Sequence, residues 1–146
     1  MHILNELKYA GIHENDLLTI YKLFVRSICE YCSVVFHSSL TQDQIDKLEA
    51  IQSTALKIIL ADRYVNYKSA LIYFKMDTLA ERRDKHMLKF TLKCTKDPHN
   101  QKMFPKNVNI RGKDIYHVNF ARTSQYLHSA VPQCQRLLND EANKEK

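Results

Sequence analysis

The sequence contains very little glycine and proline and no tryptophan: only two Gly and three Pro occur among its 146 residues. Because tight turns depend on glycine and proline, this scarcity argues against a turn-rich β protein and favours long helices. The length suffices for one domain, and the apolar residues, 45% of the chain, can form a core. We therefore predict an all-α fold, a small bundle of about five to six helices with a long irregular arm near the C-terminus.

A membrane-spanning run and a secretory signal are also missing. The most apolar stretch, from Cys32 to Phe36, is far shorter than the about 20 residues that a helix needs to cross a bilayer. The first residues alternate polar and apolar side chains at helical spacing and form no unbroken apolar segment. We therefore expect a soluble, intracellular protein without a membrane partner, and the sequence does not distinguish cytoplasm from nucleus.

Motifs for catalysis and cofactor binding are missing as well. The sequence has no glycine-rich phosphate loop, no serine motif of the nucleophile-elbow type and no adjacent pair of aspartates. Its seven histidines form no cluster with metal-ligand spacing. We predict no catalytic residue, no metal site, no cofactor and no small-molecule substrate for this chain, and a free-standing enzyme is the hypothesis that the sequence favours least.

Four cysteines are present. Cys29 and Cys32 have a spacing that occurs in zinc sites, but no second pair accompanies them, and both fall within an apolar helical pattern. We interpret them as small core residues, with zinc binding as the alternative. Without a secretory signal, disulfides are not expected.

Apolar residues recur at helical spacing through most of the first 98 residues. Gly11 should end the first helix, and capping-box sequences predict helix starts at Thr41 and Thr78. Asn66 can cap a short helix, and Pro98 should end the helix that precedes it. The predicted helices span 2–10, 14–37, 41–59, 67–74 and 79–96.

The helix at 14–37 has the widest apolar face, and we expect it to be buried on more than one side. This face consists of Leu17, Ile20, Tyr21, Phe24, Ile28, Tyr31, Cys32 and Val35. In the helix at 79–96, we expect the core to contain Leu79, Met87, Phe90 and Cys94, with Leu88 and Leu92 close by.

Helical periodicity is lost between His99 and about Tyr126. We interpret this stretch as an extended arm, followed by a helix that Pro132 opens and by a polar, frayed end from Asn139. The predicted organisation is a helical domain at 1–98, an extended basic and aromatic arm at 99–131, and a C-terminal helix with a frayed tail at 132–146.

The clearest functional signal is a concentration of positive charge between Arg82 and Lys96. Six Lys or Arg residues accompany one acid, Asp84, so this stretch has a charge of +5, against +6 for the whole chain. At about 100° per residue, five of the six fall within about 80° of one another on a helix. A polyanion such as nucleic acid is the natural partner of such a stripe; a merely solvated face is the alternative. The predicted nucleic-acid-binding residues are Arg82, Arg83, Lys85, Lys89, Lys93 and Lys96.

The arm contains further cations interleaved with aromatic residues, a composition that suits single-stranded nucleic acid through charge and stacking. The alternative is that aromatic side chains hold the arm against the helices. We expect this of at least two of the four, which are Phe104, Tyr116, Phe120 and Tyr126. The predicted nucleic-acid-binding residues of the arm are Arg111, Lys113 and Arg122.

Segments along nearly the whole chain resemble one known family in their order and spacing. These segments are 16–26, Glu30-Tyr31, 35–41, 46–52, 55–60, Tyr67 with Ala70-Leu71, 79–83, 120–123 with Tyr126 and Ser129, and Pro132 with 136–139. Together they resemble the C-terminal region of the reverse transcriptase of jockey-like non-LTR retrotransposons, its thumb and the segment that follows. The sequence departs from the family pattern at Ser27 and Val34 (usually Pro), Phe36 (Trp), Lys57 (Arg) and Ala61 (Gly).

The resemblance implies a helical module that packs along the primer–template duplex of an RNA-directed DNA polymerase encoded by a transposable element. The catalytic aspartates of that polymerase belong to its palm, which this chain lacks, so no catalytic residue is carried over. The helix from Leu79 to Lys96 is carried over as a template-contacting or structural helix. The implied partners are nucleic acid and the missing palm.

The second hypothesis is a small helical protein-interaction module. In the family this region packs on the palm, so an isolated copy would expose the surface that the palm covers. The candidate patch consists of Val25, Cys29, Phe36 and parts of Leu4 and Leu7.

Overall fold

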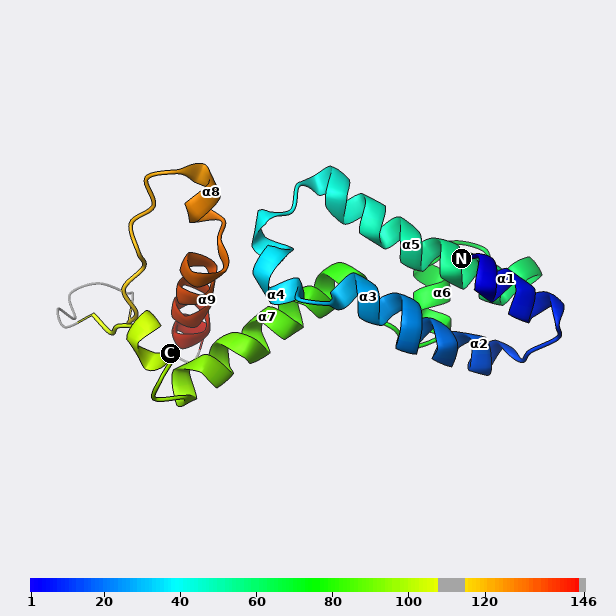
Figure 1. The fold of residues 1–146 in the computed structure, drawn as a ribbon, viewed down its shortest axis with the longest axis horizontal. Helices are drawn as coiled ribbons and strands as arrows, with labels where there is room; N and C mark the ends of the chain where they lie inside the picture. Colours follow the sequence, from blue (N-terminus) through cyan, green and yellow to red (C-terminus); the bar gives the residue numbers. More distant parts are fainter. Residues whose placement is uncertain (108–114, 145–146) are drawn as a thin grey trace. The chain divides into compact units, whose positions relative to one another are not determined.

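The structure is a computed structural model that describes residues 1–107 and 115–144 (Figure 1). Within these ranges the chain is helical with irregular connections, and no strand occurs beyond one isolated antiparallel bridge between Lys106 and Tyr116. The predicted all-α fold is confirmed. The α-helices are α1 (His2–Tyr9), α2 (Glu14–Ile20), α3 (Ser27–Glu30), α4 (Ser33–Phe36), α5 (Gln42–Leu60), α6 (Tyr67–Tyr73), α7 (Leu79–Lys96), α8 (Ser124–Leu127) and α9 (Ala130–Lys144).

The chain forms two compact units, and each is described by itself. The N-terminal unit consists of Met1–Tyr31 and Thr41–Arg82, and the C-terminal unit consists of Cys32–Leu40 and Arg83–Lys146. This division differs from the predicted boundaries at 98 and 131. The reason is that the arm and α9 share a core with most of α7 and with α4, which periodicity along the sequence does not reveal.

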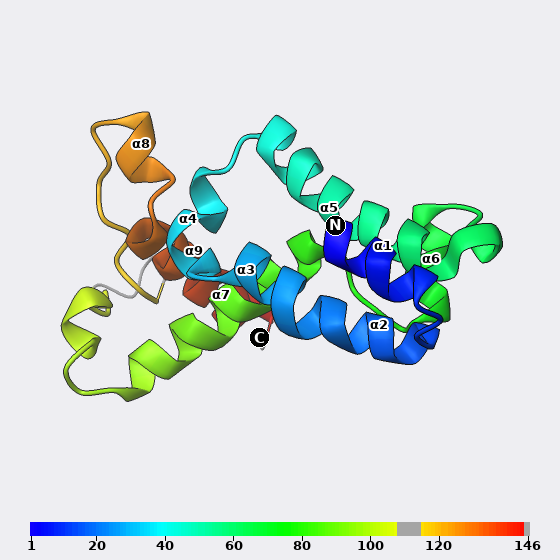
Figure 2. The same ribbon diagram turned by 45° about the vertical axis from the view of Figure 1, so that its right-hand side comes forward.

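In the N-terminal unit, α1, α2 and α6 pack against the long α5 (Figure 2). Their contact surface is a single cluster of buried apolar side chains, in which Leu17, Tyr21 and Leu56 are completely buried. Burial of each such side chain contributes roughly 1.5–3 kcal/mol. Gly11 follows α1 with a φ of +82°, the left-handed conformation that glycine adopts readily, so the predicted end of this helix is confirmed.

Helix starts in this unit are fixed by local hydrogen bonds. The Gln44 amide donates to Thr41 Oγ1 at 3.4 Å, and the Thr41 amide donates to Gln44 Oε1 at 3.0 Å. Thr78 and Glu81 repeat this reciprocal pair at the start of α7, at 3.1 and 3.0 Å. Asn66 caps α6 through the Ser69 amide at 2.8 Å. The predicted caps are therefore confirmed, and each contributes about 1 kcal/mol to helix stability.

A buried polar network lies in the core of the N-terminal unit. The Gln52 side chain is fully buried, accepts a hydrogen bond from Tyr21 Oη at 2.9 Å, and donates to Tyr67 Oη at 2.9 Å and to the Asp77 carbonyl at 3.0 Å. Burial raises the pKa of the Tyr21 and Tyr67 phenols. Glu49 accepts from Tyr67 Oη at 2.5 Å and from the Ala80 amide at 2.7 Å, so the network also caps α7.

The predicted continuous helix at 14–37 is wrong. It is interrupted by a π-helical segment, Tyr21–Arg26, and it ends at Tyr31, after which Cys32 has a left-handed φ of 52°. Because a π-helical turn takes up an extra residue, the side chains that follow are rotated away from the positions of a regular α-helix. Ile28 and Tyr31 are consequently 76% exposed, although both were expected in the core.

The C-terminal unit has its own core, which is formed by Met87, Cys94, Phe104, Cys134 and Leu138. The short helix α8, which was not predicted, precedes α9, and Arg136 Nη2 of α9 donates to the Leu127 carbonyl of α8 at 3.1 Å. The polar end was predicted to fray from Asn139, but α9 continues to Lys144, and Pro132 is its third residue, not its first. The helix persists because Asn139 is buried and hydrogen-bonded, which ties this end of the chain into the core.

The described part of the arm is held on α9 by side-chain amides that bind its backbone. Asn139 accepts from the Tyr116 amide at 2.8 Å and donates to the Tyr116 carbonyl at 3.0 Å. Gln135 accepts from the Asn119 amide at 2.8 Å and donates to the Met103 carbonyl at 2.8 Å. The arm therefore belongs to the C-terminal unit.

Replacing Asn139 with alanine should release this part of the arm. The substitution removes both hydrogen bonds to Tyr116, at a cost of about 2 kcal/mol. We expect hydrogen exchange at the Tyr116 and Asn119 amides to accelerate by at least about tenfold while the far-UV spectrum keeps its helical signal. Asn143→Ala, at an exposed position of the same helix, is the control; unchanged exchange in Asn139→Ala would contradict this description.

Candidate nucleic-acid interface

The helix α7 has two opposite faces with the same spacing. Four buried side chains are spaced by four, four and three residues, and they are Arg83, Met87, Thr91 and Cys94. Exposed lysines repeat this spacing two residues later, at Lys85, Lys89, Lys93 and Lys96. Two residues correspond to about 200° around an α-helix, so the lysines lie opposite the buried side chains. We name these four lysines the lysine face.

Packing of the buried side fixes the rotation of α7. The Cys134 thiol approaches the Met87 sulfur at 3.7 Å, and the Thr91 hydroxyl donates to the Met87 carbonyl at 2.8 Å. Desolvation raises the pKa of the Cys94 and Cys134 thiols, so both remain neutral core groups. The lysine face is therefore directed outward by the core of the C-terminal unit and does not depend on interactions of the lysines themselves.

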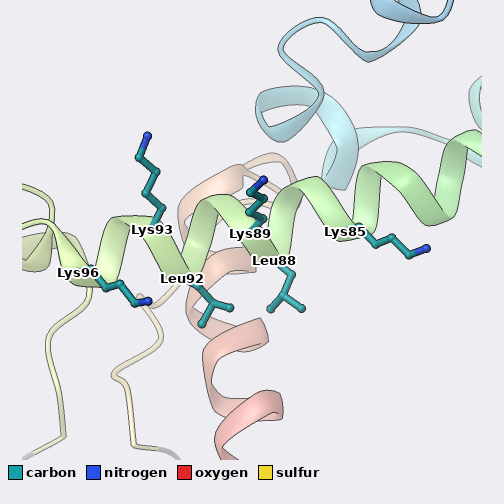
Figure 3. Close-up of a pocket in the computed structure, with 6 residues that line it drawn as sticks. All are labelled: Lys85, Leu88, Lys89, Leu92, Lys93 and Lys96. Atoms are coloured by element: carbon teal, nitrogen blue, oxygen red, sulfur yellow. The ribbon is translucent and has the colours of Figure 1, made fainter. Parts of the chain in front are cut away.

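A hollow of about 520 Å³ runs along the lysine face and is also lined by Leu88 and Leu92. Figure 3 shows the two leucines pointing together from one side of α7, with Lys89 and Lys93 on the other. We expected both leucines near the core, but Leu92 is 43% exposed, and so is Phe90 at 45%. At 100° per residue, Leu92 falls within about 40° of Lys85 and Lys96, whereas Leu88 falls at the edge between the lysine face and the buried face. The helical angle could therefore have identified Leu92 as exposed.

Three lysines of this face, Lys89, Lys93 and Lys96, have no hydrogen-bond or ion-pair partner among the described residues. The one acid of the basic stretch, Asp84, is engaged elsewhere: its Oδ1 lies 2.7 Å from His37 Nε2. This pair links the turn after α4 to α7. Lys89, Lys93 and Lys96 consequently present positive charge that no described acid pairs with.

The two arginines at the start of the predicted stripe are placed differently. Arg82 makes a two-pronged ion pair with Glu30, in which Nη2 donates to Oε2 at 2.9 Å, and this hydrogen bond raises the pKa of Arg82. Arg83 is completely buried. Neither arginine therefore presents its charge beside the lysine face. The exposed part of the predicted stripe begins at Lys85 and not at Arg82. Glu30 is distant in sequence, so local spacing could not reveal the pairing.

The cations predicted in the arm are only partly described. Arg122 is exposed before α8, whereas Arg111 and Lys113 lie outside the described residues. Of the four aromatics, Phe104 is buried in the core of the C-terminal unit and Tyr116 packs against it, which confirms that at least two hold the arm. Phe120 is 84% exposed and Tyr126 is 40% exposed, so these two remain available for contacts outside the chain.

Metal ligands do not converge in the part of the chain that the structure describes: no group of three His, Cys, Asp or Glu side chains there could hold an ion. None of the four cysteines, all of which the structure describes, forms a disulfide. The expectation that Cys29 and Cys32 are core residues within one helix is wrong for Cys32, which is exposed beyond the break after α3.

No family model matches the chain, and neither a curated protein nor a solved structure matches it. Among the described helices, none combines the length and the apolar character that crossing a membrane requires.

Proposed function

We propose that the chain binds nucleic acid through the lysine face of α7, as a catalytically empty counterpart of the thumb and following segment of a non-LTR retrotransposon reverse transcriptase. In this proposal the chain contributes affinity for an RNA–DNA template–primer duplex. Polymerase chemistry requires the palm aspartates, which the chain does not contain. The family assignment rests on the ordered sequence segments quoted above.

One observation carries the binding proposal: Lys89, Lys93 and Lys96 are exposed on one side of a helix, with no partner among the described residues. An isolated surface lysine usually indicates only solvation, and a mixed surface of Lys and acids is typical of such faces. A row of lysines with successive turns of helix between them instead matches the repeating charges of a phosphate backbone. The hollow that these lysines line together with Leu88 and Leu92 allows close approach of a sugar–phosphate strand.

The test is binding of the full chain to a labelled RNA–DNA hybrid and to the separate strands over a range of salt concentrations. Three to four phosphate contacts predict a slope of about −3 in a plot of log affinity against log salt. A slope near zero, or no binding at low salt, would contradict the proposal.

The alternative, a protein-interaction module, is favoured by a different surface. The expected patch is largely covered: Leu4 is 2% exposed, and Leu7 and Val25 pack against the core. A different group of apolar side chains is exposed on the π-helical segment, α3 and the residue after it: Leu23, Phe24, Ile28 and Tyr31 are all above 60% exposure. Concentration-dependent association in sizing experiments, lost in Phe24→Ser/Ile28→Ser, would support this function; a monomer at all concentrations would contradict it.

A further inference from the structure

A second group of cations lies in the N-terminal unit, outside the lysine face. Lys22, Arg26 and Glu30 are spaced by four residues along the π-helical segment and α3, so they follow one side of this helical stretch. The short π-helical segment is itself uncommon, and π-turns within helices occur frequently at functional sites. Arg82, from the first turn of α7, joins this row through its ion pair with Glu30.

The carboxylate of Glu30 is occupied by Arg82, because both of its oxygens accept from that guanidinium. Lys22 and Arg26 have no hydrogen-bond or ion-pair partner among the described residues, and both are partly buried. Desolvation, and then the neighbouring positive charges, lower the pKa of both groups; Arg82 contributes to each of these shifts. Glu30 and Asp77 both act on Arg82, so three cations lie within electrostatic range of two carboxylates, and the folded chain retains part of the repulsion among the cations.

We propose that Lys22, Arg26 and Arg82 form a binding site for a phosphate group, preferentially a dianionic phosphomonoester. Three cations beside Glu30 and Asp77 leave an excess of positive charge, which suits an anionic phosphate. Arginine presents a planar fork that fits phosphate oxygens, and lysine adds a compact point charge. Partial exposure leaves the heads of Lys22 and Arg26 accessible to a ligand. This site goes beyond the proposed function, because the lysine face of α7 belongs to the C-terminal unit.

The phosphate can come from two sources, free phosphate or the terminal phosphate of a nucleic-acid strand. Calorimetric titration of the full chain at about pH 7.5, where a phosphomonoester with a second pKa of about 6 is dianionic, distinguishes them. The probes are inorganic phosphate and a short single strand with and without a 5′-phosphate, all at one ionic strength. Tighter binding of the 5′-phosphorylated strand than of the same strand without the phosphate, with the difference lost in Lys22→Gln/Arg26→Gln, identifies the strand end as the ligand. Equal binding of the two strands, together with binding of inorganic phosphate, identifies free phosphate.

Two variants should change the affinity for inorganic phosphate in opposite directions. Lys22→Gln/Arg26→Gln should weaken it by at least about tenfold, because two charged donors are lost. Glu30→Gln should strengthen it, because Arg82 is released and a negative charge is removed. The matched control, Lys57→Gln/Lys68→Gln, makes the same charge change at exposed positions of the same unit and should bind phosphate like the original chain.

The proposal is overturned if the original chain binds inorganic phosphate no better than chloride, or if the Lys22→Gln/Arg26→Gln variant and its control lose affinity equally. If the Lys22→Gln/Arg26→Gln variant does not fold, the Glu30→Gln variant provides the test. Phosphate binding by Glu30→Gln that equals or is weaker than that of the original chain overturns the proposal. Glutamate substitutions on the lysine face of α7 should leave inorganic phosphate binding unchanged. The two sites can therefore fail independently of each other.

Discussion

Replacing Lys89, Lys93 and Lys96 together with glutamate should almost abolish binding to an RNA–DNA hybrid. Each phosphate contact contributes roughly tenfold in affinity at about 0.1 M salt, so losing three predicts a decrease on the order of 10²- to 10³-fold. The slope of log affinity against log salt should become less steep by about 2.7, because three fewer counterions are released. Fluorescence anisotropy over a salt series measures both quantities.

The control must reproduce the change in net charge, because three Lys→Glu substitutions alter the formal charge of the chain from +6 to 0. Lys57, Lys68 and Lys75 are exposed lysines of the N-terminal unit, and their replacement with glutamate makes the same change. If only overall charge attracts the nucleic acid, both triple variants will lose affinity equally. If the lysine face is the binding surface, the control will keep most of the salt dependence.

The two triple variants also separate the lysine face from a solvated surface. A solvated face needs no ligand, and substitutions on it usually change the free energy of unfolding by less than about 0.5 kcal/mol. We expect the Lys89, Lys93 and Lys96 variant to keep its stability, since the opposite side of α7 provides the packing. If this variant keeps both its stability and its affinity for the RNA–DNA hybrid, the basic stretch is only a solvated face.

Sequence reasoning succeeded where a structural feature depends on neighbouring residues. The starts of α5, α6 and α7 are fixed by side chains three residues away from the amides they bind, so the motifs at Thr41, Asn66 and Thr78 contain the necessary information. The lysine face is equally local, because a repeat of four, four and three residues determines which side chains share one side of α7.

Sequence reasoning failed where contacts between segments distant in sequence determine the position or the partner of a residue. The sequence predicts that Asn139 belongs to a polar tail. Asn139 is buried because the Tyr116 backbone provides a donor and an acceptor for its side-chain amide. The pairing of Arg82 with Glu30 spans 52 residues, so the sequence shows two unrelated charges. The interruption of the helix at 14–37 was likewise not predicted, because its apolar pattern alone favours an unbroken α-helix.

Replacing Gln52 with leucine should cause the largest loss of stability of any single substitution considered. Leucine fills a similar volume but removes all three hydrogen bonds of the Gln52 amide, leaving the buried Tyr21 hydroxyl without its acceptor and the Asp77 carbonyl without this donor. Each buried polar group left unpaired costs about 1–3 kcal/mol. We therefore expect the free energy of unfolding to decrease by about 3 kcal/mol, a large share of the 5–15 kcal/mol typical of a domain.

Urea unfolding followed by circular dichroism measures this loss, and two further variants identify its cause. Gln42→Leu, at an exposed position of the same helix, should change the free energy of unfolding by less than about 0.5 kcal/mol. Adding Tyr21→Phe to Gln52→Leu should cost less than the sum of the two single substitutions, because the orphaned hydroxyl is then absent. Strict additivity would mean that the Tyr21–Gln52 hydrogen bond does not stabilise the core, and that packing alone holds α2 on α5.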